Sequence, residues 1–278
     1  MPLIDTHLHL WDPQAVAIPW VGGNATLNRR FAAAEFAAAS ADCQVERAVF
    51  IQCDAGDGAA EVAWVTAQAR IDPRIVAIVA HAPLEQGEAV RARLDELARH
   101  PLVRGIRRII QGEPAGFCAQ PGFVTGVQAL AGSDLSFDLC LRRDQLEEAI
   151  ALAKACPRVR FMLDHLGNPP IKQKTMDGWG APLAELARLP NVSCKLSGIV
   201  TVADPQGTID DLVPYVEHAL RCFGPRRLLW GSDWPVVLLA SDYRHWVDTA
   251  RTLLAMLSDA DRQSILHDNA IAFYRLSP

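Results

Sequence analysis

The chain contains, near its start, the stretch IDTHLHLWDP (residues 4–13), which decides the fold that we expect. It predicts a buried strand that ends in two histidines, His7 and His9, two residues apart. Side chains two apart on a strand point the same way, so both imidazoles should face one small volume. Such a pair can hold a divalent metal or polarise a carbonyl group. An isolated His-x-His is more often a strand end with two unrelated polar residues, so the interpretation depends on the rest of the chain.

Seven further apolar runs follow, and amphipathic stretches separate them. Each run is short, nearly continuous and rich in Val, Ile, Leu or Phe, which is typical of parallel strands buried on both faces. The predicted strands are Leu3–Leu8, Arg47–Cys53, Ile75–His81, Val103–Ile110, Leu135–Leu141, Val159–His165, Val192–Ser197 and Arg227–Asp233. The predicted helices include Gly58–Ala69, Gln86–Arg99, Arg143–Lys154 and Thr208–Cys222.

Eight strand-helix pairs in 278 residues favour an α/β fold, the (β/α)₈ TIM barrel, as one domain over residues 1–278. An open doubly wound sheet is the second candidate fold. It is less favoured because no Gly-x-Gly-x-x-Gly turn follows the first strand. The long connection from Trp11 to Val45 is expected to cover part of the active site. We expect the segment Asp259–Tyr274 to form a final helix on the outside of the barrel.

Composition excludes several classes of protein. The formal net charge of −5 gives no basic surface, so we expect no nucleic-acid partner and no attraction to an acidic membrane. Seven scattered cysteines without a Cys-x-x-Cys pair indicate reduced thiols in a cytoplasmic protein. No apolar run approaches the roughly 20 residues of a membrane helix, and the first strand begins too early for a leader segment. A monomer and a homodimer both remain open.

Chemistry in a TIM barrel belongs at the carboxyl ends of the strands. The sixth run closes with His165, three residues before Asn168, and the eighth closes with Asp233, just before Trp234. The sequence therefore predicts that three imidazoles and one carboxylate converge on one mouth of the barrel.

Four motifs, taken in this order, resemble the amidohydrolase superfamily. They are the opening stretch, DHLGNP (164–169), CKLSG (194–198) and LWGSDWP (229–235). The set is most similar to the sugar and dicarboxylate lactonase branch, which includes L-fucono-lactonases, L-rhamnono-lactonases and 2-pyrone-4,6-dicarboxylate lactonases. The segment RGIRR (104–108), which contains Arg107, also resembles a turn of that branch.

The resemblance implies that His7 and His9 are the histidine pair of the first strand, His165 the histidine of the sixth and Asp233 the aspartate of the eighth. The fourth run ends without a lysine that could bridge two metals, and the fifth run ends without a histidine. We therefore expect these four residues to hold at most one divalent ion, Zn²⁺ or Mn²⁺. The branch has members that need no metal, so the ion is optional.

Opening a lactone requires a base for water, a donor or cation for the developing oxyanion and an acid for the leaving alkoxide. Asp233 is the predicted base and later acid, and His7, His9 and His165 are predicted to polarise the carbonyl directly or through the metal. The expected reaction is hydrolysis of a sugar-acid lactone of the L-fucono type to the free aldonic acid. The alternative is a metal-dependent decarboxylase of an aromatic or unsaturated acid. A serine hydrolase is disfavoured because no Gly-x-Ser-x-Gly elbow is present.

Several further residues are candidates for substrate binding, each with a structural alternative. Arg107 could bind a polar substrate or be a charged strand end, and His81 could donate to substrate or sit at the rim. Lys195 could recognise hydroxyl groups or be an ion-pair partner. The remaining candidates are Ser197, Asn168, Trp20 and Trp234, of which the tryptophans could serve only in packing. Asp164 is expected to support its neighbours from behind.

Overall fold

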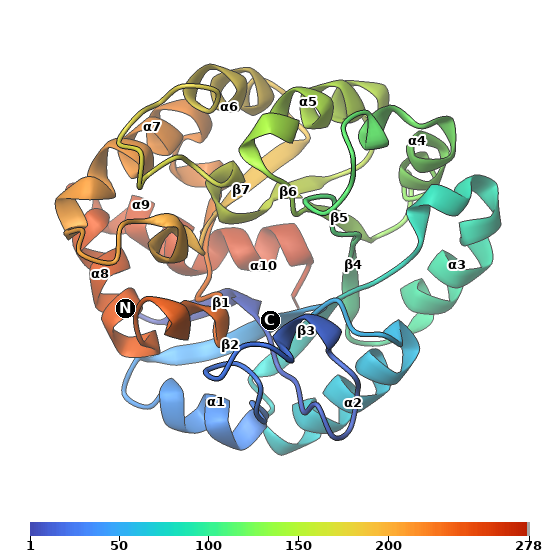
Figure 1. The fold of residues 1–278 in the computed structure, drawn as a ribbon, viewed down its shortest axis with the longest axis horizontal. Coiled ribbons are helices and arrows are strands. Elements are labelled where there is room, and N and C mark those ends of the chain that lie inside the picture. Colours follow the sequence, from blue (N-terminus) through green and yellow to red (C-terminus); the bar gives the residue numbers. More distant parts are fainter. Residues whose placement is uncertain (277–278) are drawn as a thin grey trace.

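The computed structural model describes residues 1–276, and its centre is a ring of eight parallel strands (Figure 1). In sheet order the strands are β1 (Leu3–Leu8), β2 (Val45–Ile51), β3 (Ile75–Ala80), β4 (Val103–Arg107), β5 (Ser136–Leu139), β6 (Phe161–Leu163), β7 (Val192–Leu196) and β8 (Leu228–Trp230). The ring closes beyond the end of β8, where His9 N donates to Trp234 O over 2.7 Å and Asp233 N donates to His7 O over 2.8 Å. The predicted (β/α)₈ barrel is confirmed.

Helices alternate with the strands and surround the ring (Figure 1). They are α1 (Ala33–Ala39), α2 (Gly58–Ile71), α3 (Arg91–Arg99), α4 (Pro121–Gln128), α5 (Leu146–Ala155), α6 (Gly180–Ala187), α7 (Val213–Phe223), α8 (Tyr243–Leu253), α9 (Asp259–Gln263) and α10 (Asn269–Tyr274). Asp57 caps the start of α2 by accepting hydrogen bonds from the Ala59 and Ala60 N–H groups. No helix in the described part is long and apolar enough to cross a membrane.

The final segment differs from its prediction. It is divided into α9, a π-helical turn over Ser264–Asp268 and α10, and α10 lies across the centre of the ring rather than outside it (Figure 1). Ala270 and Tyr274 pack into an apolar cluster with Ile4, Val49 and Met162, which the strands provide. Helix α10 therefore closes the end of the barrel that lies opposite the carboxyl ends of the strands. Without α10, the apolar side chains of this cluster would be open to water.

The long connection after β1 contains a 3₁₀ turn, Pro19–Val21, and helix α1. Trp11 and Phe31 pair in an antiparallel bridge and pack edge to face, with ring centroids 5.6 Å apart. The exposed Trp20 donates from Nε1 to Cys53 O over 2.7 Å, and its ring lies at the cavity described below. This connection therefore contributes to the mouth of the barrel, as its length predicted.

Candidate active site

A cavity of about 410 Å³ opens at the carboxyl ends of the strands. Side chains from the ends of seven strands, together with the connection after β1, form its wall. The lining residues are His9, Trp20, Cys53, Asp54, Arg107, Ile109, Gln111, Gly112, Cys140, His165, Asn168, Gly198, Thr201, Asp233 and Val236. The volume lies within the usual range of sites for small molecules.

The pairing of β1 with β2 is irregular around His7. The register between β1 and β2 shifts between Asp5 and Leu8, so the simple alternation of side chains is interrupted there. Asp5 consequently accepts hydrogen bonds from Tyr243 Oη (3.0 Å) and Ser232 N (2.8 Å), whereas His7 faces Asp164. Asp5 supports the strand and stays out of the cavity.

Three electron-pair donors meet where β1 and β8 end. His9 Nδ1 lies 2.8 Å from Ile51 O, so this nitrogen carries the proton and Nε2 keeps its lone pair. His7 Nε2 is 3.2 Å from His9 Nε2, and Asp233 Oδ1 is 3.4 Å from His9 Nε2 and 3.7 Å from His7 Nε2. Ligands of a tetrahedral Zn²⁺, each about 2.0–2.1 Å from the ion, lie about 3.3 Å apart. This donor set therefore fits one divalent cation.

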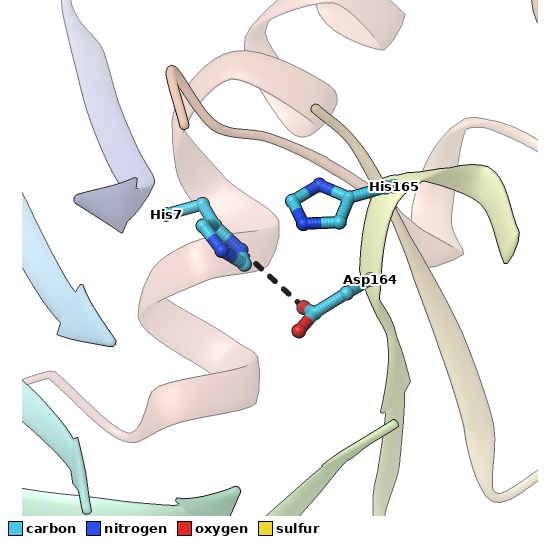
Figure 2. Close-up of side chains that lie close together, drawn as sticks. All are labelled: His7, Asp164 and His165. Atoms are coloured by element: carbon cyan, nitrogen blue, oxygen red, sulfur yellow. Dashed lines mark ion pairs between the residues drawn. The ribbon is translucent and has the colours of Figure 1, made fainter. Parts of the chain in front are cut away.

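A second group combines His7 and His165 with Asp164 (Figure 2). Asp164 Oδ1 lies 3.3 Å from His7 Nδ1, and the rings of His7 and His165 are tilted with centroids 4.5 Å apart. The carboxylate of Asp164 thus lies behind His7, on the side away from His9. This is the supporting place expected for Asp164.

Residues directly after β6 and β8 have a left-handed backbone, and their side chains lie at the cavity. His165 has φ 54° and Asp233 has φ 59°, so the two strands end at Leu163 and Trp230, earlier than predicted. His165 Nδ1 lies 2.9 Å from Ser197 Oγ. Gly198, at φ 63°, lies against the same ring, because a Cβ atom there would come within 2.4 Å of His165 Nδ1. Only glycine provides both the backbone angle and the space.

Burial keeps the three imidazoles neutral. It lowers the pKa of His7 well below its ordinary value, lowers the pKa of His165, and together with Arg107 lowers the pKa of His9 to about 3. Burial also raises the pKa of Asp233 to about 6, although His165 and Arg107 oppose this shift. Neutral imidazoles are the form that can bind a metal or accept a proton.

Arg107 contacts both the buried residues of the site and the cavity. Its Nη1 atom lies 3.2 Å from Asp164 Oδ2 and 3.4 Å from His7 Nε2, and its Nη2 atom donates to Gln52 O. Burial alone would raise the pKa of Asp164, but Lys195, His7 and Arg107 hold that pKa well below its usual range. Asp164 is therefore a carboxylate, and Arg107 is a cation at the cavity wall.

Comparison with known proteins agrees with this geometry. Residues 4–276 match the family model described as amidohydrolase. The chain belongs to the amidohydrolase family. This amidohydrolase is 35% identical over 207 residues to an L-fucono-1,5-lactonase of Burkholderia ambifaria, a match that covers 73% of this chain and 71% of that protein. It is 32% identical over 287 residues to an L-fucono-1,5-lactonase of Burkholderia multivorans, and this match covers 98% of this chain and 96% of that protein. A crystal structure of an amidohydrolase from Burkholderia multivorans with bound Zn superposes with a TM-score of 0.90 at 29% identity over the full length of both chains.

The structure of this amidohydrolase brings most of the predicted catalytic residues to one place. His9, His165 and Asp233 line the cavity, and His7 lies directly beneath, within 4 Å of His9 and Asp233. Of the predicted substrate-binding residues, Trp20, Arg107 and Asn168 line the cavity. Asn168 Nδ2 is held by Leu141 O at 2.6 Å, so its side-chain oxygen is the group left to meet a ligand.

Four predicted substrate-binding residues do not line the cavity. Lys195 is fully buried and pairs with Asp138 and Asp164, so its alternative role as an ion-pair partner holds. Ser197 is also buried, and its hydroxyl contacts His165. Trp234 is 2% exposed and packs edge to face on Phe31, and the half-buried His81 packs against Gly58 of α2.

Sequence reasoning missed several residues of the wall. Gln111 and Thr201 come from the loops after β4 and β7, where no pattern marked them. Cys53 and Cys140 were treated only as scattered thiols, although Cys53 ends one predicted buried run and Cys140 is the second-last residue of another. Asp138, which is buried and does not line the cavity, was also missed, although a carboxylate inside the apolar run of the fifth strand was a signal for it.

Proposed function

We propose that this amidohydrolase hydrolyses a sugar-acid lactone of the L-fucono type to the free aldonic acid. The observation that carries the proposal is the meeting of His7 Nε2, His9 Nε2 and Asp233 Oδ1 within 3.7 Å at a cavity whose wall includes Arg107. The two relatives named L-fucono-1,5-lactonase support the choice of substrate class.

Asp233 is the proposed general base and acid. Its Oδ1 atom faces the two histidines, and its Oδ2 atom faces Gly198 at the cavity wall. A water O–H proton passes to this carboxylate as the water oxygen bonds to the lactone carbonyl carbon. The ring C–O bond then breaks, and Asp233 returns the proton to the leaving alkoxide. Water is consumed, no redox change occurs, and the carboxylate is restored.

The oxyanion that develops on the carbonyl requires positive charge or N–H donors. Arg107 provides a buried guanidinium at the cavity wall. We propose that His7, His9 and Asp233, with His165 beside them, can also hold one Zn²⁺ or Mn²⁺. When bound, this ion would act as a Lewis acid toward the carbonyl oxygen.

The cavity wall suits a ligand with several hydroxyl groups. Gln111, Asn168, Thr201 and Asp54 bring amide, hydroxyl and carboxylate groups to it. Trp20, with 44% of its surface exposed, offers an apolar face on which a sugar ring can lie. A small polyol ring would therefore find hydrogen-bond partners and one flat wall.

A substrate panel with a pH indicator tests the proposal. The purified enzyme is assayed against aldonolactones of both ring sizes, before and after treatment with a chelator, and in parallel for CO₂ release from hydroxybenzoic acids. The proposal predicts acid release from L-fucono-1,5-lactone and related rings, without CO₂ release. Acid release from none of the lactones, or CO₂ release alone, would contradict it. The chelated sample shows whether the metal is required.

A further inference from the structure

A chain of buried polar side chains runs from the last helix to the candidate site. Tyr274 on α10 donates from Oη to Asp138 Oδ2 over 2.9 Å, and Lys195 Nζ donates to the same oxygen over 2.7 Å. Lys195 Nζ also lies 3.1 Å from Asp164 Oδ1, which in turn is 3.3 Å from His7 Nδ1. The closed end of the barrel is thereby connected to a residue of the open end.

Burying these polar and charged side chains costs folding free energy that apolar packing would not cost. Tyr274, Asp138 and Lys195 are all fully buried. Charges removed from water cost several kcal/mol each, and well-packed apolar side chains often stabilise a core as well as a buried ion pair does. Other interior positions are filled in that apolar way, by residues such as Ile4 and Met162, and Met162 pairs with Asp138 in the register of β5 and β6. The charges therefore point to a role at the site.

The role concerns the proton of His7. Two groups face His7 Nδ1: the acceptor Asp164 Oδ1 at 3.3 Å and the donor Lys195 Nζ at 3.4 Å. If Nδ1 carries the proton and donates to Asp164, His7 Nε2 keeps its lone pair toward His9 and Asp233. If Lys195 donates to Nδ1, the proton is on Nε2 and that lone pair is lost. The placement of Lys195 thus selects the tautomer.

We propose that Tyr274 is a positioning residue for His7. Its hydroxyl shares Asp138 Oδ2 with Lys195, and these two contacts anchor the ammonium group under Asp164. Without the hydroxyl, the Asp138 carboxylate is held at Oδ2 by Lys195 alone and can turn, so Lys195 Nζ loses its fixed place and can approach His7 Nδ1, 3.4 Å away. Asp164 then no longer fixes the proton on His7 Nδ1. Only the kinetic consequence rests on the proposed lactonase function.

Tyr274→Phe is the direct test. It removes one hydroxyl and keeps the ring that Lys195 Nζ faces at 5.5 Å. ¹⁵N spectra of histidine-labelled protein report the tautomer, and the His7 signal is assigned as the one missing from His7→Gln. Wild type should show the proton on Nδ1, and Tyr274→Phe should show a mixture of tautomers. On the lactone, kcat should fall by about 3- to 30-fold with KM within twofold, since couplings of this kind are about 0.5–2 kcal/mol.

Tyr215→Phe is the matched control. Tyr215 is also buried, but its hydroxyl donates to the Pro170 and Thr175 carbonyls, away from the site. It should lower stability and leave both the His7 spectrum and kcat unchanged. If Tyr274→Phe does not fold, Asp138→Asn changes the same acceptor and is measured in the same way. A His7 signal identical to that of wild type in the folded variant would overturn the proposal. If no lactone is hydrolysed, the spectra still decide it.

Discussion

Gly198 and His165 show how a single residue shapes the site. The ring of His165 occupies the space that a side chain at position 198 would need. A glycine in the sequence CKLSG could have been interpreted as a turn, but its contact with a histidine 33 positions earlier depends on the barrel closing. The end of the sixth predicted run and the family resemblance therefore identified His165, but nothing in the sequence identified the residue that makes room for it.

Gly198→Ala should impair catalysis more than stability. The added Cβ atom would lie 2.4 Å from His165 Nδ1, so the ring must move. A misplacement of about 1 Å can cost about 100-fold in rate, so kcat/KM should fall by that order. Gly178→Ala is the control, since Gly178 has φ 67° and open space around its Cβ position. Equal activity of the two variants would contradict this account of the ring's position.

Glu61 on α2 is a buried carboxyl group behind the cavity wall, where its Oε1 accepts from Cys53 N over 2.7 Å. Burial raises its pKa to about 7 from 4.5, so the folded protein retains a proton that the unfolded chain releases. The free energy of unfolding therefore falls as pH rises from 4.5 to 7, by about 3 kcal/mol from this group.

Glu61→Gln should remove that part of the pH dependence. The free energy of unfolding of wild type and variant is measured with urea at pH 5 and pH 8. The difference, variant minus wild type, should be larger at pH 8 than at pH 5 by up to about 3 kcal/mol. Glu147→Gln, at an exposed position on α5, should follow wild type at both values. Parallel pH profiles for wild type and Glu61→Gln would refute the assignment.

At the scale of elements, β1 and α10 show where periodicity is informative and where it is not. The bounds of β1 were predicted correctly, but the irregular register of β1 was not, because register depends on pairing with β2. The pattern of α10 identified an amphipathic segment without saying which apolar surface it covers. Ala270 and Tyr274 meet side chains from β1 and β6 across the barrel end, and such contacts are not local in sequence.

Asn269 attaches α10 to the barrel. Its Nδ2 atom donates to Pro225 O and Leu228 O, each over 2.7 Å. Asn269→Ala leaves two carbonyls without this donor and should lower the free energy of unfolding by about 1–3 kcal/mol. Chemical denaturation measures the loss. Asn24→Ala in the connection after β1 is the comparison, because the half-buried Asn24 side chain bonds only within its own turn, where it accepts from the Thr26 and Leu27 N–H groups. A loss under about 0.5 kcal/mol would indicate that α10 is held by apolar packing alone.

At the scale of the whole molecule, the order of buried runs predicted the barrel, and the barrel rule then predicted its active end. The four residues His7, His9, His165 and Asp233 could be found because each stands within one residue of the end of a predicted run. The loops that complete the cavity could not be found in this way. Their positions depend on turns such as those at His165 and Asp233, whose left-handed backbone no pattern in the sequence marks.

The central claim is that Asp233 moves the proton at the barrel mouth. The most direct measurement is kcat for L-fucono-1,5-lactone hydrolysis by Asp233→Asn, with Asp248→Asn on the outer helix α8 as the exposed control. General acid-base groups contribute about 10²- to 10⁴-fold, so Asp233→Asn should lose at least about 100-fold while it folds normally and Asp248→Asn stays at the wild-type rate. A folded Asp233→Asn variant within threefold of wild type would contradict the account.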